Sequence, residues 1–469
     1  MITIDKVLEG NYCIGCGVCA AVNNSNYTIE TTKEGRYKAV NTNLDANDEL
    51  PDKVCPFTSA SMNEDELGDK YFSEIKDITK DNELGYYLNS YAGYVDEGSF
   101  REAGSSGGGV SWLLSILMEE NLIDAVIHVK EANSKDDTIF EFAISENLLE
   151  MRKGAKSRYY PVEMSEVMKK IKNTDKRYAI VGVPCFIKAA RNLSENDKEI
   201  KKRIVYYIGI VCGHLKSKNF TSLFAWQQGI HPKDVINIDF RHKVPSSSAA
   251  LYAIKITYKK GDKILQKVSK TASELYGTDW GLGFFKYKAC DYCDDVLAET
   301  SDVVFGDAWA AKYRKDWKGS NLVLTRNETI DSLIKKGIND KKLQFDVIDK
   351  DIVMASQGGS FRHRRKGLAY RLHKLRQEGI WAPQKRVDPQ DAKLDDHKYI
   401  KVQNYRMKFL DVVDKYFTEA LEKNNFQHFK RKLAFPILRY KYLVYGIRGI
   451  IPSWTKDLYR SIFKSVNEK

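Results

Sequence analysis

Three cysteines near the start of the chain constrain its fold more than any other feature. They form the run Cys13-Ile-Gly-Cys16-Gly-Val-Cys19, and a fourth cysteine, Cys55, stands directly before Pro56. Iron–sulfur clusters are held by thiolates at such two-residue gaps, with a Cys-Pro pair closing the set. Glycines between the ligands let the backbone approach the sulfurs and donate N–H bonds to them. We therefore expect these four cysteines to hold an iron–sulfur cluster.

A structural zinc ion is the alternative for this first set of thiols, because zinc sites also use four cysteines. Zinc sites usually pair two knuckles of the type C-x2–4-C, whereas this set has three evenly spaced members and one remote member. The pattern therefore favours a cluster and leaves zinc open. Two short strands, at about 27–30 and 37–40, are expected between Cys19 and Cys55.

The other four cysteines lie between residues 185 and 293. Cys185 and Cys212 each end an apolar stretch typical of a buried strand, and Cys290 and Cys293 form a C-x2-C pair. In open α/β sheets, functional groups gather at the carboxyl ends of strands. None of the eight cysteines is left over, so the sequence predicts a second cluster. The alternative is two small core residues beside a lone knuckle.

Eight cysteines in an apparently cytosolic chain indicate metal chemistry rather than disulfides. The N-terminus lacks the apolar segment of a secretory signal, and no apolar run reaches the roughly 18 residues of a membrane-spanning helix. We therefore expect a cytoplasmic protein of mixed α/β or α+β class. A length of 469 residues suggests more than one domain. From the patterns along the chain we expect a small ferredoxin-like cluster domain at 1–85, a catalytic mixed-sheet domain at 86–385 and a basic helical tail at 386–469.

A glycine-rich loop, Ser106-Gly107-Gly108-Gly109, lies between a predicted strand at 91–95 and an apolar helix that begins near Val110. Such a loop directs N–H groups and the helix dipole at an anion, such as the pyrophosphate of a cofactor. The alternative is a tight turn without a ligand.

The run Lys156-Ser157-Arg158-Tyr159 precedes another predicted helix. It offers two cations, a hydroxyl and an aromatic ring, which could hold a phosphate and stack a flat ring. A solvated entry to the helix is the alternative.

Much of the net charge of +12 lies near the C-terminus, where residues 427–469 hold ten basic and two acidic side chains. Aromatic and aliphatic residues are interleaved with these basic ones, a pattern typical of an interfacial helix on anionic lipid. The tail at 395–469 is therefore a candidate for contact with an anionic membrane surface at the inner face of the membrane. Docking to a partner protein and packing against the body stay open, and nucleic acid binding is not expected.

Short motifs along residues 10–365 resemble, in order and spacing, those of one protein family. They are the run Cys13–Cys19, Gly107–Val110, Ile123–Val126, Lys156–Tyr159, Val181–Cys185, Cys212–His214, Asp239–Arg241, Lys288–Cys293 and Phe305–Trp309. The family is that of the beta subunit of coenzyme F-420 hydrogenase/dehydrogenase. Its relatives include 7-hydroxymethyl chlorophyll a reductase and bacterial homologues associated with polysaccharide biosynthesis.

The resemblance implies an FAD-dependent iron–sulfur oxidoreductase with two [4Fe-4S] clusters. It suggests that the flavin lies near the glycine loop and Lys156–Tyr159, beside a cluster on Cys185, Cys212, Cys290 and Cys293. The first four cysteines would hold the outer cluster. Electrons would enter there from a ferredoxin or similar donor and pass through the second cluster to FAD. The substrate would be a sugar or lipid-linked precursor in polysaccharide biosynthesis.

Two residues are candidate proton donors if a C=C or C=O bond is reduced: His214 and Asp307. A structural role beside Cys212 is the alternative for His214. Four cations could hold an anionic substrate or be solvated at the surface: Arg241, Lys243, Lys286 and Lys288. A different interpretation of the whole chain is an electron-transfer subunit of a larger complex, with coenzyme F-420 as one option and no substrate of its own. No oligomeric state is predicted.

Overall fold

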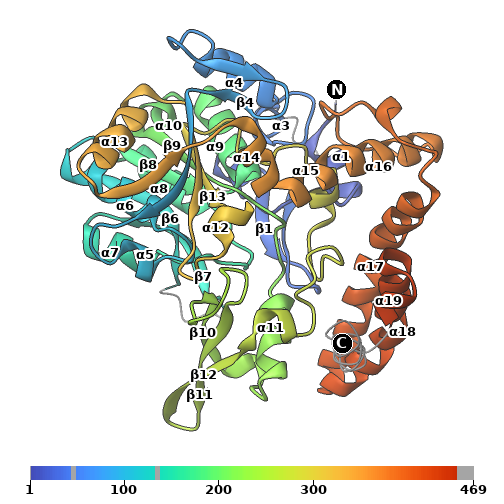
Figure 1. Ribbon diagram of the computed structural model, residues 1–469. Helices are drawn as coiled ribbons and strands as arrows, with labels where there is room; N and C mark the ends of the chain where they lie inside the picture. The colour runs from blue at the N-terminus through green and yellow to red at the C-terminus, as the bar shows by residue number, and fades with distance from the viewer. Residues whose placement is uncertain (1, 44–48, 133–137, 451–469) are drawn as a thin grey trace, which may run out of the picture.

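The computed structural model describes residues 2–43, 49–132 and 138–450, and a large mixed sheet with helices on both faces forms its centre (Figure 1). The strands of this sheet are, in spatial order, β15 (Leu343–Val347), β5 (Asn89–Val95), β14 (Asn321–Thr325), β13 (Val303–Asp307), β9 (Ile204–Ile210), β8 (Tyr178–Gly182), β6 (Ala125–Glu131) and β7 (Phe140–Ser145). β13, β9, β8 and β6 pair in parallel, and the flanking strands pair antiparallel. The predicted mixed α/β class is confirmed.

β8 and β9 hold no charged residue, and β6 and β13 each begin with three apolar residues, because both faces of the sheet are covered. Ile127 and Ile180 point into one core, whereas Val126 and Val181 point into the other. The first core is completed by α8 (Ser165–Lys172) and α9 (Pro184–Asn196), and the second by α6 (Gly109–Glu119) and α13 (Glu328–Asn339). Shorter helices are α5 (Phe100–Ala103), α7 (Leu148–Lys153), α10 (Lys198–Arg203), α12 (Ala311–Arg314) and α14 (Lys350–Ser356).

The N-terminal segment packs onto the first of these cores. Its elements are α1 (Ile4–Glu9), α2 (Val18–Ala21), β1 (Tyr27–Thr31), β2 (Tyr37–Asn41), α3 (Leu50–Val54), α4 (Glu64–Phe72), β3 (Thr79–Asp81) and β4 (Gly85–Tyr87). β1 and β2 form the hairpin that the sequence predicts. Tyr12, Val18 and Phe57 share a buried core with α8 and α9. Packing therefore joins the region of the first four cysteines to the large sheet.

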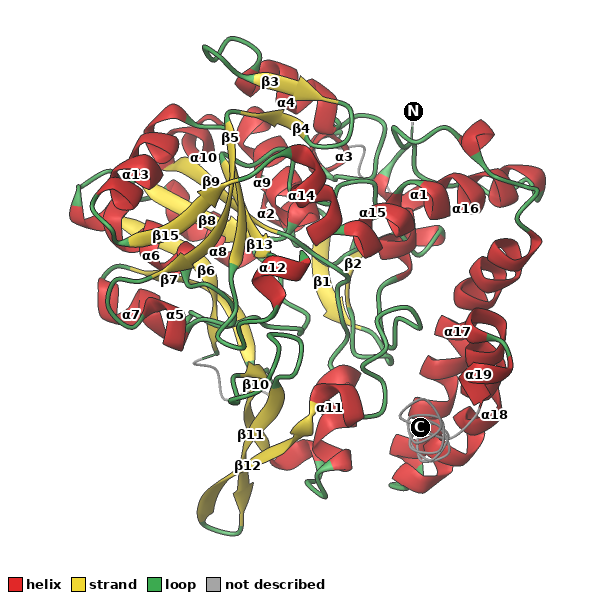
Figure 2. Ribbon diagram, in the orientation of Figure 1, coloured by secondary structure: helices red, strands yellow, loops and turns green. Residues whose placement is uncertain are grey.

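A second, three-stranded antiparallel sheet extends away from the large one (Figure 2). It consists of β10 (Val235–His242), β11 (Ala253–Lys260) and β12 (Lys263–Thr271), and it lies beside α11 (Asn219–Gln227). Phe240 and Ile256 of this sheet and Phe224 of α11 belong to one core. That core also receives the C-terminal helices.

The C-terminal region is helical, as predicted. Its elements are α15 (Gly358–Arg364), α16 (Lys366–Gln377), α17 (His397–Glu422), α18 (Phe426–Tyr445) and α19 (Ile447–Ile450). Phe417 of α17 and Phe429 and Leu433 of α18 are buried against Phe285. One face of the tail therefore packs on the body of the protein, which is one of the alternatives that the sequence left open. Within the described ranges, no helix is both long and apolar enough to span a membrane. The rest of the predicted tail, 451–469, lies outside the described residues.

The carboxyl ends of four strands meet at one edge of the large sheet. β8, β9 and β13 are parallel neighbours, and β5 runs the same way because two antiparallel pairings separate it from β13. Cys185 follows β8, Cys212 follows β9, Asp307 ends β13 and the glycine loop follows β5. This edge therefore gathers the polar groups, as is usual for α/β sheets.

Candidate functional site

The first four cysteines line a single apolar cavity in the N-terminal segment. The side chains of Cys13, Cys16, Cys19 and Cys55 share it with Ile4, Val7, Leu8, Ile29, Ala39 and Phe57. Gly15 and Gly17 turn the chain around it with φ angles of 65° and 85°, which glycine adopts without strain. The backbone N–H groups of Gly15 and Ala39 each donate to Sγ of Cys13 at 3.4 Å. The turn brings together the thiols that the sequence assigned to one cluster.

Burial disfavours the ionised form of these thiols when no metal is bound. It raises the pKa of all four, to about 12 for Cys55, and the charges of neighbouring thiolates raise the pKa of Cys16 and Cys19 further. Iron or another cation would offset this effect, because metal ligation requires the thiolate. Buried thiols, an apolar wall and N–H donors to sulfur fit a cluster site.

The second set of cysteines converges at the edge of the large sheet. Cys212, Cys290 and Cys293 all act electrostatically on Cys185, and Leu215 N donates to Sγ of Cys290 at 3.3 Å. Burial raises the pKa of Cys212 to about 12 and that of Cys290 to about 11. The two sets are neighbours, since the charge of Cys16 also acts on Cys185. Across the described parts of the chain, no group of three or more His, Cys, Asp or Glu side chains is arranged to hold a single metal ion.

Two buried cations beside the second set were not foreseen from the sequence. Lys216 and Arg364 are 3% and 2% exposed, and neither has an ion-pair partner among the described residues. Arg364 Nη2 donates to the carbonyl of Gly213 at 3.1 Å, and its guanidinium also donates to the Cys212 thiol. Buried unpaired cations are costly unless an anion lies near them. The second set of thiols therefore fits a group that carries negative charge.

The glycine loop is packed tightly against the sheet. A Cβ atom at Gly107 would lie 2.6 Å from Oδ1 of Asn321, and one at Gly109 would lie 2.6 Å from the ring of Phe305. Gly108 has a φ of 88° and turns against the backbone of Phe100 and Arg101. The N–H of Gly109 donates to Asn321 at 2.8 Å. Packing thus accounts for the three glycines, and a ligand role for Ser106–Gly109 stays a prediction.

The structure does bring the run Lys156–Tyr159 to this loop. The N–H of Ser157 donates to Oγ of Ser105 at 2.9 Å, and Lys243 Nζ donates to the carbonyl of Ser106 at 2.8 Å. Burial, together with the cations Lys156, Arg101 and Arg241, lowers the pKa of Lys243 to about 7. Asp239, Asp316 and Asp307 pair with Lys156, Arg101 and Arg241. Lys243 therefore has no ion pair among the described residues and is the cation of this group that favours an anionic ligand.

Arg158 and Tyr159 complete the run. The guanidinium of Arg158 lies 4.5 Å from the ring centroid of Phe140, and its Nε is buried without a hydrogen-bond partner within the described ranges. Tyr159 contacts the rings of Phe240 and Trp280 edge-on, at 5.4 and 5.3 Å between centroids. An unsatisfied buried N–H and a wall of aromatic rings fit a flavin nucleotide, and the contact of this run with the flavin stays a prediction.

His214 lies at the same end of the sheet, between two rings. Its imidazole is 5.2 Å from the ring of Trp280 and 6.0 Å from that of His363. Burial lowers the pKa of His214 well below its usual value, and Lys216 and Lys286 lower it further. Its Nδ1 is buried and has no hydrogen-bond partner in the described part of the chain. The imidazole is therefore neutral, and its role as a proton donor stays a prediction.

Asp307 is held in an ion pair. Its Oδ2 lies 2.6 Å from Nη1 of Arg241, whose guanidinium also faces the rings of Tyr252 and Trp309. The ion pair gives Asp307 a structural role as the partner of buried Arg241, and its catalytic role stays a prediction.

The structure places the four cations suggested for an anionic substrate in different environments, and not all of them are solvated at the surface. Arg241 and Lys286 are buried, the latter paired with Asp291, and Lys243 contacts the loop. Lys288 donates to the carbonyl of Gly10 at 2.8 Å. Solvation at the surface is thus wrong for Arg241 and Lys286. The burial of a single lysine or arginine cannot be recognised in a sequence, and for this reason the sequence did not indicate Lys216 or Arg364. Trp280 lies in no motif, so its place beside Tyr159 and His214 also comes from the structure alone.

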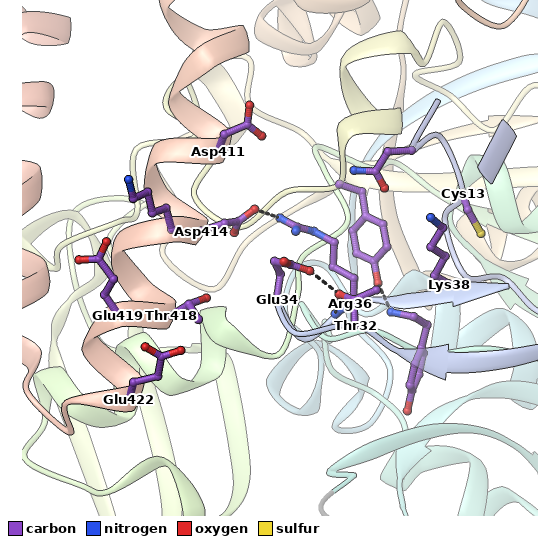
Figure 3. Close-up of a pocket in the computed structure, with 14 residues that line it drawn as sticks. Cys13, Thr32, Glu34, Arg36, Lys38, Asp411, Asp414, Thr418, Glu419 and Glu422 are labelled. Carbon is purple, nitrogen blue, oxygen red and sulfur yellow. Dashed lines mark hydrogen bonds and ion pairs between the residues drawn. The ribbon is translucent and has the colours of Figure 1, made fainter. Parts of the chain in front are cut away.

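A polar cavity of about 490 Å³ adjoins the first set of cysteines. Figure 3 shows Asp411, Asp414, Glu419 and Glu422 along α17 on one side, with Arg36 and Cys13 on the other. Arg36 spans the gap and donates to Asp414 at 2.7 Å. The cavity leads from α17 to Cys13 and is large enough for a small molecule.

Comparison with known proteins adds the following similarities. Residues 90–169 match the family model for the N-terminal part of the coenzyme F420 hydrogenase/dehydrogenase beta subunit, and residues 175–351 match the model for its C-terminal part. The chain is 22% identical over 360 residues to a coenzyme F420-dependent sulfite reductase from Methanocaldococcus jannaschii, and the match covers 73% of this chain. It spans about half of that curated relative, 49% of its length. A chain of the F420-reducing [NiFe] hydrogenase complex from Methanosarcina barkeri superimposes with a TM-score of 0.48 and 14% identity, over 65% of this chain and 99% of that one.

Proposed function

This chain belongs to the coenzyme F420 hydrogenase/dehydrogenase beta-subunit family, and from that premise we propose that it is an iron–sulfur flavoprotein oxidoreductase. Two [4Fe-4S] clusters and FAD are the proposed cofactors. The observation that carries the proposal is the placement of two separate sets of four thiols, one in an apolar cavity and one at the sheet edge, with Cys16 close to Cys185. Adjacent clusters suit electron transfer, because electrons pass between them without bond formation.

The side chains of this chain would bind the cofactors and exclude water from them. Cys13, Cys16, Cys19 and Cys55 would hold one cluster, and Cys185, Cys212, Cys290 and Cys293 the other. When bound, the clusters supply one-electron transfer and the flavin supplies exchange between one- and two-electron steps. Arg158 and Lys243 would bind the phosphates of the nucleotide, and Tyr159 and Trp280 would shield a flat ring from water. The neutral His214 could donate an N–H hydrogen bond at this site.

The proposed electron donor is a ferredoxin or similar protein that reaches the first set of thiols. The cavity beside Cys13 is the part of the described surface that supports this, because it leads directly to a ligand of that set. Donor binding would be weakened by a bulky substitution in the wall of the cavity, such as Thr418→Trp. Stopped-flow reduction of the clusters by reduced ferredoxin would detect this, and equal rates in variant and parent would contradict entry at this cavity.

For the substrate, we propose an anionic sugar or lipid-linked precursor in polysaccharide biosynthesis. Buried Arg241, which is paired with Asp307, is the cation that supports an anionic substrate beside those assigned to the flavin. A second candidate is electron transfer to or from coenzyme F420 within a larger complex, which is favoured by the family descriptions and by the name of the curated relative. Reduction of coenzyme F420 by the isolated protein, followed by its absorbance, would support the second candidate over the first.

Membrane contact through the tail is a further part of the proposal. Phe435, Leu438, Tyr442 and Tyr445 are 71%, 45%, 53% and 59% exposed on the face of α18 that points away from the body. α18 contains five basic and no acidic residues, and each basic residue near anionic lipid contributes roughly 1 kcal/mol. A Phe435→Ser and Tyr442→Ser double variant should lose co-sedimentation with phosphatidylglycerol vesicles. Ile264→Ser, at an exposed position on β12, is the matched control.

The cofactor assignment is tested directly on the purified protein. Iron and acid-labile sulfide should be present in equal amounts, near eight of each per chain, together with one flavin released on denaturation. Electron paramagnetic resonance (EPR) of the reduced protein should show two cluster signals. A colourless protein that contains zinc instead would overturn the proposal.

A further inference from the structure

The charges around the two sets of thiols are opposite in sign. Beside the second set lie Arg364 and Lys216, both buried and both without a carboxylate partner in the described ranges. Lys286 and Lys385 also act on this set, but Asp291 and Asp294 pair with them. Arg364 and Lys216 therefore remain at the second set without an ion pair, although the carboxylate of Asp295 acts on Arg364.

Beside the first set, the charged groups are mainly carboxylates. Glu163 acts on Cys16 and Asp52 acts on Cys55, each raising the pKa of the thiol. Lys38 is the one cation that acts on Cys13 among the described residues, and it is only half-buried. Water screens a half-buried charge more than a buried one. The first set therefore lies in a more negative environment.

Of the two unpaired cations, Arg364 keeps its positive charge more firmly. A guanidinium stays charged at all relevant pH values, and this one donates directly to Cys212. Burial and the charge of Lys286 lower the pKa of Lys216, the thiolates of Cys290 and Cys212 oppose this, and the net pKa is about 7. An anionic group on these thiols would favour the charged form of Lys216 in the same way. Its ammonium is held by the carbonyl of Phe284 at 2.8 Å.

We propose that Arg364 and Lys216 raise the reduction potential of the group held at Cys185, Cys212, Cys290 and Cys293 above that of the group held at the first four cysteines. Reduction adds negative charge, which neighbouring cations stabilise and neighbouring carboxylates oppose. One electron would then leave the first set, which is oxidised, and arrive at the second, which is reduced, without proton transfer or bond change. The inference rests on the proposed function, because it requires a cluster at each set.

The test is a redox titration of the holoprotein with dithionite and mediator dyes, followed by EPR. In the Arg364→Gln variant, the signal of higher potential should shift to lower potential. The expected change in its reduction equilibrium is about tenfold, or about 59 mV for one electron. The signal of lower potential should stay within a few millivolts of its parent value. Arg362→Gln is the matched control, because it makes the same change at an exposed position of α15.

Two further variants separate charge from structure. Arg364→Lys keeps the charge and should shift the potential less than Arg364→Gln does. Lys216→Met keeps an unbranched side chain but removes the ammonium, so it should shift the same signal in the same direction. If Arg364→Gln loses iron, Lys216→Met decides the matter alone.

The outcomes distinguish this inference from the proposed function. Two clusters in the parent protein, with the higher-potential signal unmoved in both Arg364→Gln and Lys216→Met, would overturn the inference and leave the proposed function standing. A shift of the lower-potential signal instead would overturn it as well. Fewer than two clusters by iron and sulfide content in the parent would overturn the proposed function, and the inference with it.

Discussion

Replacing Asp414 by asparagine is expected to stabilise the protein at pH 8, and to stabilise it less at pH 5. Asp414 lies on α17 in the wall of the cavity beside Cys13 and is 9% exposed. Burial raises its pKa from 3.8 to about 6, since the loss of water outweighs the attraction of Arg36, and Glu34 and Asp411 add charge of the same sign. Asparagine has nearly the same shape but carries no charge.

The magnitude follows from the two pKa values of this group. Because the folded protein holds this proton more tightly than the unfolded chain, the contribution of Asp414 to stability falls as the pH rises from 3.8 through 6. At pH 8 the buried charge costs about 3 kcal/mol, and at pH 5 it costs about half as much. The stabilisation by Asp414→Asn should therefore be about 1 kcal/mol larger at pH 8.

Urea unfolding of parent and variant at both pH values measures this difference, with tryptophan fluorescence as the probe. Taking the difference between the two proteins cancels the titration of groups that they share. Glu422→Gln, which removes an exposed carboxylate of the same helix, is the matched control. A variant that is less stable than the parent at pH 8 would refute the reasoning, because the ion pair with Arg36 would then outweigh burial.

Three other predictions concern the candidate site. Cys16→Ala and Cys185→Ala should each lower the iron content by about half, because each removes a ligand of one cluster; full iron content in either variant would show that its cysteine is not a ligand. The affinity for FAD, measured by titration calorimetry, should fall as the pH rises above 7. The reason is that a bound phosphate favours the charged form of Lys243, whose pKa is lowered to about 7. Lys243→Met should weaken FAD binding and make it less dependent on pH, and a parent affinity that does not change with pH would contradict this contact. Arg241→Met should destabilise the protein by about 3 kcal/mol in urea unfolding, because it leaves the Asp307 carboxylate without its cation. The double variant Arg241→Met, Asp307→Asn should recover part of this stability. An absence of recovery would contradict the loss of the ion pair as the cause.

Local patterns in the sequence were sufficient for several elements. Apolar runs such as 178–183 predict buried strands, and these strands occupy the centre of the sheet as β8, which is buried throughout, and β9, which is buried at 207–209. The hairpin between Cys19 and Cys55 and the helical C-terminal region were also recognisable, because periodicity and turn residues act over a few positions.

The tail shows where local pattern stops being sufficient. Its apolar residues belong to two classes: Phe417, Phe429 and Leu433 are buried against the body, whereas Phe435 and Tyr442 are exposed on the opposite face. Both classes have the same amphipathic signature in sequence. Which face is covered depends on the core around Phe285, which lies more than a hundred residues away along the chain.

The sequence by itself determined which residues can carry the chemistry: eight cysteines in two groups, with glycines where the chain must turn around the first group. Only the tertiary structure decided which groups surround them. It placed Cys16 close to Cys185, paired Asp307 with Arg241, and buried Arg364 and Lys216 beside the second set. The reason is physical: ligand identity depends on side-chain type and short spacing, whereas charge environment depends on burial and on contacts between segments far apart in the chain.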